Sequence, residues 1–261
     1  MGVLNVTTDS FSDGGCFFDV ERAVAHAQSL VEAGADIIDV GGESTRPGAE
    51  PVEEAEEMRR VLPVIERLAS ISDVVISIDT MKPAVAQAAI ECGAEIVNDV
   101  TGLRDAQMRE VVRAGGAGAI AMHMQGAPRD MQLAPQYEDV VGEIREFFRQ
   151  TFAACLASGM DETRLAFDPG IGFGKTVPHN LAILRNLNCM RVCGRPFVLG
   201  VSRKSFLGKV LGSDAMEDRA WPTVALTSYG RTRGANVIRV HDVQPNAQAL
   251  RMTEAILTSC P

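Results

Sequence analysis

The sequence predicts one α/β domain, a single (β/α)8 TIM barrel that spans residues 1–261. Short apolar segments alternate with amphipathic segments, and most of the amphipathic segments end at a glycine. This alternation is typical of parallel βα units with right-handed crossovers. Polar or charged residues follow most of the apolar segments, as they do where an active site is built at the C-terminal ends of barrel strands. The length of 261 residues is also close to that of one such barrel.

The expected strands are short and rich in branched apolar residues. They are Gly2–Val6, Asp36–Val40, Val74–Ile78, Ile96–Val97, Ala119–Met122, Leu165–Phe167, Phe197–Val201 and the segment Asn236–Asp242. The residues at or just after their ends include Asn5, Thr7, Glu43, Ser44, Thr45, Arg46, Asp79, Asn98, Asp99, His123, Asp168, Ser202, Arg203, Lys204, Arg239 and His241. We expect these residues to share one face of the barrel.

The expected helices lie between the strands, where apolar residues recur every three or four positions. They are Asp19–Gly34, Pro51–Ser70, Lys82–Gly93, Arg104–Gly115, Tyr137–Gly159, Pro178–Leu187, Asp218–Gly234 and Pro245–Ser259. Glycine at the end of a helix is a good C-terminal cap. Glu53, Glu54, Glu56 and Glu57 open the second helix, where its dipole favours negative charge. We therefore expect these four side chains to form a solvated acidic face.

Bulk composition narrows the class of protein. The net charge of −9 argues against affinity for nucleic acid or anionic membranes. No apolar run is long enough for a membrane helix, and no secretory signal opens the chain. The six cysteines lack the spacing of a metal site or a disulfide framework, which favours free thiols in a reducing cytoplasm. We expect a cytoplasmic protein whose partners are small molecules.

Acids and an amide end three of the expected strands, at Asp79, Asn98 and Asp168. Any one of them has a structural explanation; Asp79, for instance, precedes a helix that it could cap. Together they suit a heterocycle with adjacent N–H donors, because one carboxylate accepts two such donors side by side. They also suit a metal, although the set lacks the histidines that a transition metal prefers.

Cations follow the seventh and eighth strands, the usual phosphate site of a TIM barrel. They are Arg203, Lys204, Arg239 and His241, and each taken alone is explained as a surface cation.

The loop Asp168–Lys175 has three glycines but not the spacing of a P-loop. We expect it to be a tight loop with unusual backbone angles, in which Phe173 is exposed for stacking on an aromatic ligand. For His123 we expect a hydrogen bond that anchors its loop.

Several of these segments resemble the dihydropteroate synthases, a family of pterin-binding TIM barrels. Asn5–Gly15 and Gly41–Gly48 resemble two long and highly specific loops of that family. Six further segments match in the same order, over essentially the whole chain: Ser77–Thr80, Asn98-Asp99, Met122–Gly126, Asp168–Lys175, Ser202–Ser205 and Arg239–Asp242.

The resemblance implies a reaction and a set of roles. The family joins 4-aminobenzoate to 6-hydroxymethyl-7,8-dihydropterin diphosphate and releases 7,8-dihydropteroate and diphosphate. The implied catalytic residues are Asp79, Lys204, Arg239 and His241, and the implied pterin diphosphate site is Thr45, Asp79, Asn98, Asp168, Lys204, Arg239 and His241. The implied 4-aminobenzoate site is Phe11, Thr45, Arg46, Pro47, Phe173 and Ser202. Asn5 is the implied Mg²⁺ residue, with the metal held mostly by diphosphate oxygens. The family further implies a homodimer and a target of sulfonamides.

The chain departs from the family pattern in two places. Thr8 stands where the family usually has proline, and the first strand begins almost at residue 1, without the upstream segment of many members. We therefore expect a more mobile first loop and a less well covered barrel floor. Two other functions stay open: a pterin-binding methyltransferase, and a catalytically silent pterin-binding paralogue that acts as a partner protein. The methyltransferase should lack both the Thr45-Arg46-Pro47 segment and the Arg239/His241 pair.

Overall fold

The computed structural model describes residues 1–6, 16–44 and 48–259, and of residues 16–19 it describes the backbone alone. All eight expected strands are present and parallel. They are β1 (Gly2–Asn5), β2 (Ile37–Gly41), β3 (Val75–Asp79), β4 (Ile96–Asp99), β5 (Gly118–Met122), β6 (Leu165–Asp168), β7 (Val198–Gly200) and β8 (Val237–Arg239).

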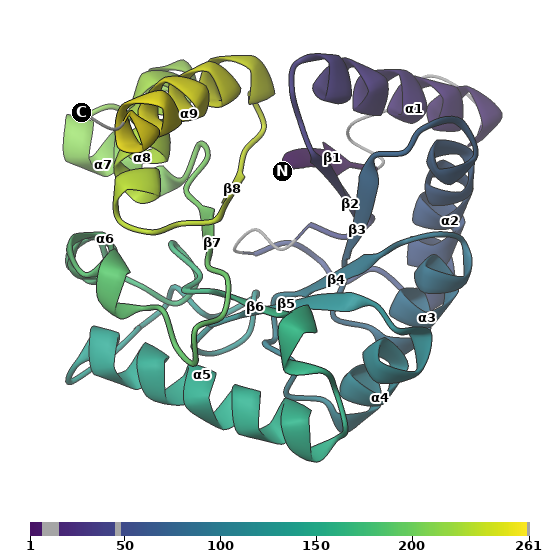
Figure 1. Cartoon of the computed structure of the whole chain (residues 1–261), viewed down its shortest axis with the longest axis horizontal. Coiled ribbons are helices and arrows are strands. Elements are labelled where there is room, and N and C mark those ends of the chain that lie inside the picture. Colours follow the sequence, from purple (N-terminus) through teal and green to yellow (C-terminus); the bar gives the residue numbers. More distant parts are fainter. Residues whose placement is uncertain (7–15, 45–47, 260–261) are drawn as a thin grey trace.

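The strands form a closed barrel inside a ring of helices (Figure 1). Strands β1 to β6 pair in sequence order, and β7 pairs with β8. Two parallel bridges join these groups, Gly2 with Val240 and Phe167 with Phe197. At the first junction Val3 N donates to Val240 O at 3.0 Å, and at the second Phe167 N donates to Pro196 O at 3.1 Å. The expected (β/α)8 barrel is therefore confirmed.

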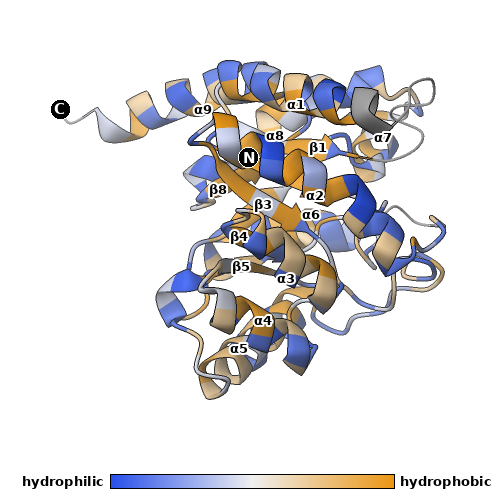
Figure 2. Ribbon diagram, turned by 90° about the vertical axis from the view of Figure 1, so that its right-hand side faces the viewer, coloured by the Kyte–Doolittle hydropathy of each residue, from blue (hydrophilic) through white to orange (hydrophobic). Residues whose placement is uncertain are grey.

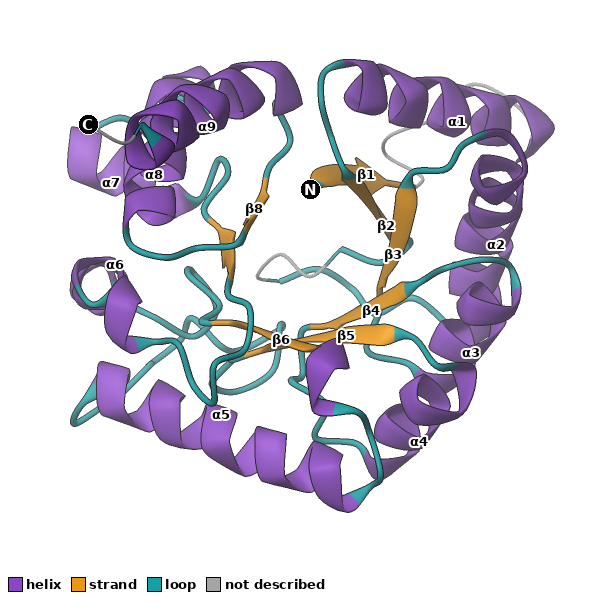
Figure 3. Ribbon diagram, viewed as in Figure 1, coloured by secondary structure: helices purple, strands orange, loops and turns teal. Residues whose placement is uncertain are grey.

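The helices follow the expected order, with one addition (Figure 3). They are α1 (Cys16–Glu32), α2 (Glu54–Ile71), α3 (Pro83–Glu91), α4 (Ala106–Gly115), α5 (Val140–Ala157), α6 (Val177–Arg185), α7 (Ser205–Leu211), α8 (Ala220–Thr232) and α9 (Val243–Thr258). The sequence predicted one helix between β7 and β8, whereas α7 and α8 both lie there. Helix α7 has only seven residues, too few to repeat an amphipathic pattern. In the described part of the chain, no helix combines the length and apolar character required to cross a bilayer.

Apolar strands lie at the centre of the molecule, and the helices around them alternate between apolar and polar residues (Figure 2). Between strands and helices, Phe148 of α5 stacks on Phe167 of β6 with 4.7 Å between ring centroids. A separate cluster within the barrel joins Met1, Ile120 and Val198, all buried. The barrel floor is thus filled at Met1, contrary to the expectation of poor cover.

Strand residues two apart point to the same side, and this places the site. On four strands an apolar residue of the interior cluster is followed two positions later by a polar one. The pairs are Ile37 and Asp39, Ile96 and Asn98, Ala166 and Asp168, and Val237 and Arg239. The barrel interior is therefore apolar toward the N-terminal ends of the strands and polar toward their C-terminal ends.

One expectation about the helices is wrong. Glu57 of α2 does not face solvent: it is 1% exposed and contacts the ammonium of Lys82, which also contacts Glu43. Glu56 pairs instead with Arg59 and Arg60 on its own helix. The helix dipole accounts for the acidic first turn, but it does not determine which acid turns toward the barrel.

Candidate active site

Arg239 belongs to the layer of polar side chains at the C-terminal ends of the strands, here called the polar layer, where it pairs with two carboxylates. Its Nε donates to Asp39 Oδ2 at 2.6 Å, and its Nη2 donates to Asp79 Oδ2 at 2.7 Å. The side chain of Asp39 is 0% exposed, that of Asp79 11% and that of Arg239 23%. Burial opposes the charge of Arg239, but the charges of Asp39 and Asp79 outweigh burial and hold its pKa above the ordinary value. The guanidinium stays charged between two carboxylates.

The two carboxylate oxygens of Asp79 have different surroundings. Its Oδ1 is buried and has no hydrogen-bond partner among the described residues. Burial raises the pKa of Asp79 to about 7; Arg239 opposes the rise and Asp39 adds to it. Asp79 lies opposite Asn98 in the β3–β4 register, as the sequence led us to expect. A buried acceptor without a donor costs free energy unless a ligand supplies one.

Asp39 is a site residue that the sequence analysis missed. Its Oδ2 accepts a second bond, from Asn98 Nδ2 at 3.1 Å, while its Oδ1 has no partner in the described part of the chain. The signal was a charged residue inside the apolar strand segment Ile37–Gly41 rather than after it. The expected site residues stand at or after the ends of strands, whereas Asp39 lies in the middle of its strand.

Asp168 and Lys204 also belong to the polar layer, and the charge of Arg239 acts on both. Asp168 Oδ1 accepts from Gly170 N at 2.7 Å, and burial raises its pKa, against Gly170 and Lys204, which lower it. Lys204 Nζ donates to Ile171 O at 2.8 Å. Burial lowers the pKa of Lys204 to about 8, and the charge of Asp168 opposes this. The Lys204 ammonium and the Asp168 carboxylate thus each shift the pKa of the other, as charged groups do at many functional sites.

Phe173 is not exposed, contrary to expectation. It is half-buried against an apolar cluster of Val100, Met122, Met124 and Met131. Lys204 Nζ lies 4.0 Å from its ring centroid. This ring face therefore carries a cation where the sequence led us to expect an open stacking surface.

The loop after β6 has the tight conformation that its glycines predict. Gly170 has φ +62°, and a Cβ there would lie 2.0 Å from the carbonyl oxygen of His123. Lys175, 3% exposed, closes the loop: its Nζ lies 3.0 Å from His123 Nδ1 and donates to Phe173 O at 2.8 Å. Burial lowers the pKa of Lys175 to about 7 and that of His123 to about 2. The loop-anchoring role expected for His123 is confirmed, and Lys175 is the partner that sequence reasoning missed.

His241 and Ser202 lie together beyond β8 and β7. His241 N donates to Ser202 Oγ at 3.1 Å, and His241 Nδ1 lies 2.9 Å from the same oxygen. Arg203, which was expected among the site cations, forms a two-bond pair with Asp242 at 3.0 and 2.5 Å. Arg203 is therefore neutralised by an acid, whereas His241 is held by a hydroxyl group.

Asn5 lies at the edge of the polar layer. A Cβ on Gly41 would be 3.9 Å from both Asn5 Oδ1 and Asp79 Oδ2, so these two oxygens flank the same point. Within residues 1–6, 16–44 and 48–259, no three His, Cys, Asp or Glu residues group in a way that would hold a metal. One amide oxygen fits Mg²⁺ if a ligand and water supply the other oxygens.

Part of the expected site lies outside the described residues. Phe11, Thr45, Arg46 and Pro47, all expected at the 4-aminobenzoate site, belong to this part, as does Thr8. Of the expected set, Asn5, Asp79, Asn98, Asp168, Phe173, Ser202, Lys204, Arg239 and His241 are described.

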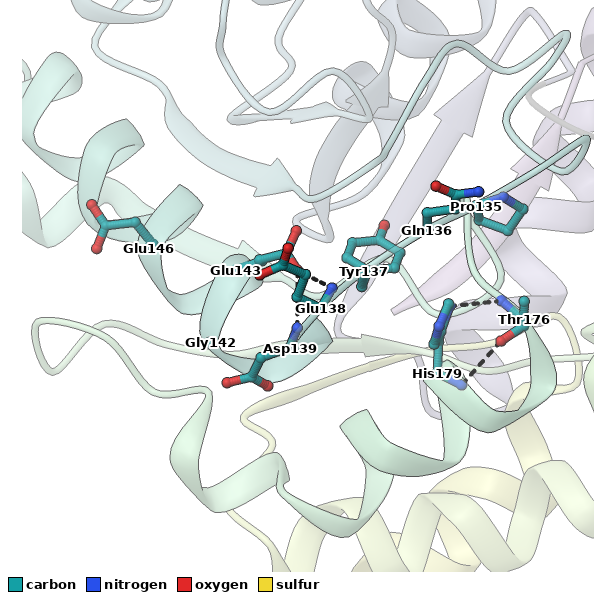
Figure 4. Close-up of a pocket in the computed structure, with 10 residues that line it drawn as sticks. All are labelled: Pro135, Gln136, Tyr137, Glu138, Asp139, Gly142, Glu143, Glu146, Thr176 and His179. Atoms are coloured by element: carbon teal, nitrogen blue, oxygen red, sulfur yellow. Dashed lines mark hydrogen bonds between the residues drawn. The ribbon is translucent and has the colours of Figure 1, made fainter.

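A surface depression of about 1010 Å³ lies elsewhere, over the start of α5 and α6 (Figure 4). Several of its polar groups are bound to one another. Thr176 and His179 exchange two bonds of 3.3 Å that cap α6, and Glu143 Oε1 accepts from the backbone of Glu138 and Asp139. None of the described residues of the expected site lines this depression. Most of the bonds just named cap α5 or α6, and Tyr137 also donates its hydroxyl proton to Gly174 O at 2.9 Å.

The sequence profile of the pterin binding enzymes matches residues 1–241. The chain belongs to the pterin-binding enzyme family. Within that family it matches dihydropteroate synthases over nearly its whole length. The Escherichia coli (strain K12) dihydropteroate synthase is 43% identical over 99% of this chain and 92% of its own.

Two solved structures show the same fold. The Xanthomonas albilineans dihydropteroate synthase with 4-aminobenzoic acid is 43% identical, has a TM-score of 0.93 and covers 100% of this chain and 93% of its own. The Yersinia pestis dihydropteroate synthase with a sulfonamide drug is 42% identical, also has a TM-score of 0.93 and covers 99% and 94%. These likenesses favour the function of a dihydropteroate synthase over that of a pterin-binding methyltransferase.

Proposed function

We propose that the polar layer of this barrel binds a dihydropterin diphosphate and carries out the dihydropteroate synthase reaction. In that reaction 4-aminobenzoate displaces diphosphate from 6-hydroxymethyl-7,8-dihydropterin diphosphate and gives 7,8-dihydropteroate. The chain is accordingly a transferase of folate biosynthesis. The observation that carries the proposal is the buried Oδ1 of Asp79, which has no partner among the described residues and lies beside Asn98 at the C-terminal end of the barrel.

Asp79, Asn98 and Asp168 hold the pterin ring in this proposal. The ring presents N–H donors on one edge, and carboxylate and amide oxygens accept them. Lys204 Nζ donates to Ile171 O in the loop after β6 and lies 4.0 Å from the ring centroid of Phe173, and the charge of Asp168 acts on it. Ionised Asp79 also stabilises the positive charge that develops on the pterin as the carbon–oxygen bond breaks.

Arg239 and His241 hold the diphosphate. Arg239 uses Nε and Nη2 for the two acids, and an arginine has five N–H donors in all. The remaining donors stabilise charge on the departing diphosphate. The whole chain carries a net charge of −9, so attraction of an anionic substrate depends on these local cations.

Asn5 would hold Mg²⁺ at the diphosphate site through its amide oxygen, together with oxygens of the diphosphate and of water. Bound there, the ion would neutralise charge on the leaving diphosphate.

The 4-aminobenzoate site combines Phe173 and Ser202 with Phe11, Thr45, Arg46 and Pro47. The amine needs no general base, because an aromatic amine is already unprotonated at neutral pH. Its correct placement beside the pterin methylene is therefore the main contribution of this site.

The oligomeric state is proposed to be a homodimer, and the compartment the cytoplasm. Exposed apolar side chains occur on and between α7 and α8: Trp221 is 77% exposed, Val210 55%, Leu211 53% and Met216 49%. A second copy of the chain would cover such side chains. Light scattering on the wild type and on Trp221→Glu tests this: we expect a dimer that the substitution weakens, and a monomeric wild type would exclude it.

Turnover is the test of the function. The chain is mixed with Mg²⁺, dihydropterin diphosphate and 4-aminobenzoate. Dihydropteroate is then measured by mass spectrometry, and the released diphosphate is quantified in the same sample. We expect both products in equal amounts, and neither without the amine. Pterin binding with no product would instead favour the silent paralogue.

A further inference from the structure

Asp39 is a buried acid that has no role in the proposed substrate site. Asp39 is 0% exposed and contacts two residues of the proposed pterin and diphosphate sites. In the β2–β3 register it lies opposite Ser77, whereas Gly41 lies opposite Asp79. Asp39 is therefore one inward-facing position closer to the barrel floor than Asp79.

A single oxygen of Asp39 joins three strands. Oδ2 accepts from Arg239 Nε at 2.6 Å and from Asn98 Nδ2 at 3.1 Å. The contact connects β2 with β4 and β8, although Asp39 and Arg239 are 200 positions apart in the sequence. Both partners are thus fixed by a group beneath the site.

The contact determines how Arg239 meets Asp79. An arginine and a carboxylate readily pair through two parallel bonds, which occupy both carboxylate oxygens. Here Asp39 holds Nε, and only Nη2 reaches Asp79, at Oδ2. Asp79 Oδ1 consequently keeps no donor among the described residues.

The same contact orients the amide of Asn98. Its NH2 group is directed to Asp39, which turns its carbonyl oxygen away from that acid. Without Asp39, the amide could present either its donor or its acceptor to a ligand.

We propose that Asp39 is a positioning residue, which holds Arg239 and Asn98 so that Asp79 Oδ1 and the Asn98 amide oxygen both face the pterin as acceptors. This inference rests on the proposed pterin site at Asp79. It adds a residue that acts through its neighbours and does not touch the substrate.

The test is the affinity for a dihydropterin without diphosphate, measured by calorimetry for the wild type, Asp39→Asn and Asp99→Asn. Asp99 is the matched control: it is equally buried and lies on β4, but its carboxylate binds Thr101 and Leu103. We expect Asp39→Asn to weaken binding about tenfold or more, the loss of one charge-assisted bond. We expect Asp99→Asn to lower the melting temperature but to keep the affinity. Equal affinities of the two variants would overturn the proposal.

A rescue separates positioning from general damage. Lysine keeps the charge of Arg239 but lacks its planar fork, so it does not occupy both oxygens of one carboxylate. The double variant Asp39→Asn/Arg239→Lys should bind the pterin more tightly than Asp39→Asn alone. Equal or weaker binding by the double variant would count against the proposal.

Two further measurements complete the design. If Asp39→Asn does not fold, the Arg239 Nε–H signal of isotope-labelled wild type takes its place. We expect this proton to stay protected from exchange when the pterin binds; exposure to exchange would overturn the proposal.

Asp79→Asn distinguishes a failure of the proposed pterin site from a failure of the positioning role of Asp39. Unchanged pterin binding by Asp79→Asn would refute the proposed pterin site itself, whereas its loss together with normal binding by Asp39→Asn would refute only the positioning role.

Discussion

Pterin binding should release a proton from Asp79, and the amount should depend on pH. Burial raises the pKa of this carboxyl to about 7 in the unliganded chain, with Arg239, Asp39, Glu57 and Asp99 as the charged groups that act on it. Ring N–H donors need the ionised form as their acceptor. A group of pKa 7 is about 90% protonated at pH 6, so about 0.9 proton should leave per pterin bound there, and almost none at pH 8.5.

Calorimetry in two buffers of different ionisation enthalpy measures this proton directly. The affinity should fall about tenfold for each pH unit below 7 and level off above about pH 8. Asp79→Asn is the control, since it has no carboxyl to titrate. Binding of the pterin to the wild type at pH 6 without proton release would refute the assignment of Asp79 as the acceptor.

Four further predictions follow from the same geometry. Asp79 should also shape the pH dependence of folding, because its pKa in the folded chain lies above the unfolded value of 3.8. Its contribution to the free energy of unfolding is present below the unfolded pKa and is lost as pH rises toward 7. A denaturation series over this pH range should show the loss for the wild type and not for Asp79→Asn. Lys175→Met should lower the free energy of unfolding by about 1–3 kcal/mol, because it leaves the carbonyl oxygen of Phe173 without its donor; urea denaturation measures this, and an unchanged midpoint would contradict it. Sulfonamides should compete with 4-aminobenzoate, which initial-rate kinetics would show as a raised KM at unchanged kcat, whereas a lowered kcat would refute a shared site. Thr8→Pro should remain active and lower the KM for 4-aminobenzoate by a few-fold, because a compatible proline recovers about 0.4–1 kcal/mol of ordering entropy; a loss of activity would mean that Thr8 needs an angle or a hydrogen bond that proline lacks.

Local pattern was sufficient to predict the strands and most of the helices. Most strands, such as Val75–Asp79, are short apolar runs that end in a polar residue, and parallel strands bring these ends to one face. Asp79, Asn98 and Asp168 were found in this way. Helix α7 was not, because its seven residues hold no repeat.

Contacts between distant residues could not be predicted. The pairing of Arg239 with Asp39 depends on the closure of β8 against β1, which no local window of sequence contains. The burial of Glu57 depends on Lys82, which begins the next helical unit. Phe173 was expected to be exposed because glycines flank it, yet Lys204 comes from a strand end some thirty residues later to cover it. In each case the sequence shows the type of residue but not its partner.

A crystal structure of this chain with a dihydropterin bound tests the central claim most directly. We predict that the ring edge lies within hydrogen-bond distance of Asp79 Oδ1, with Asn98 and Asp168 beside it and Arg239 still bound to Asp39. A pterin ring bound elsewhere, for example in the depression near Tyr137 and His179, with Asp79 Oδ1 still without a donor, would contradict the account.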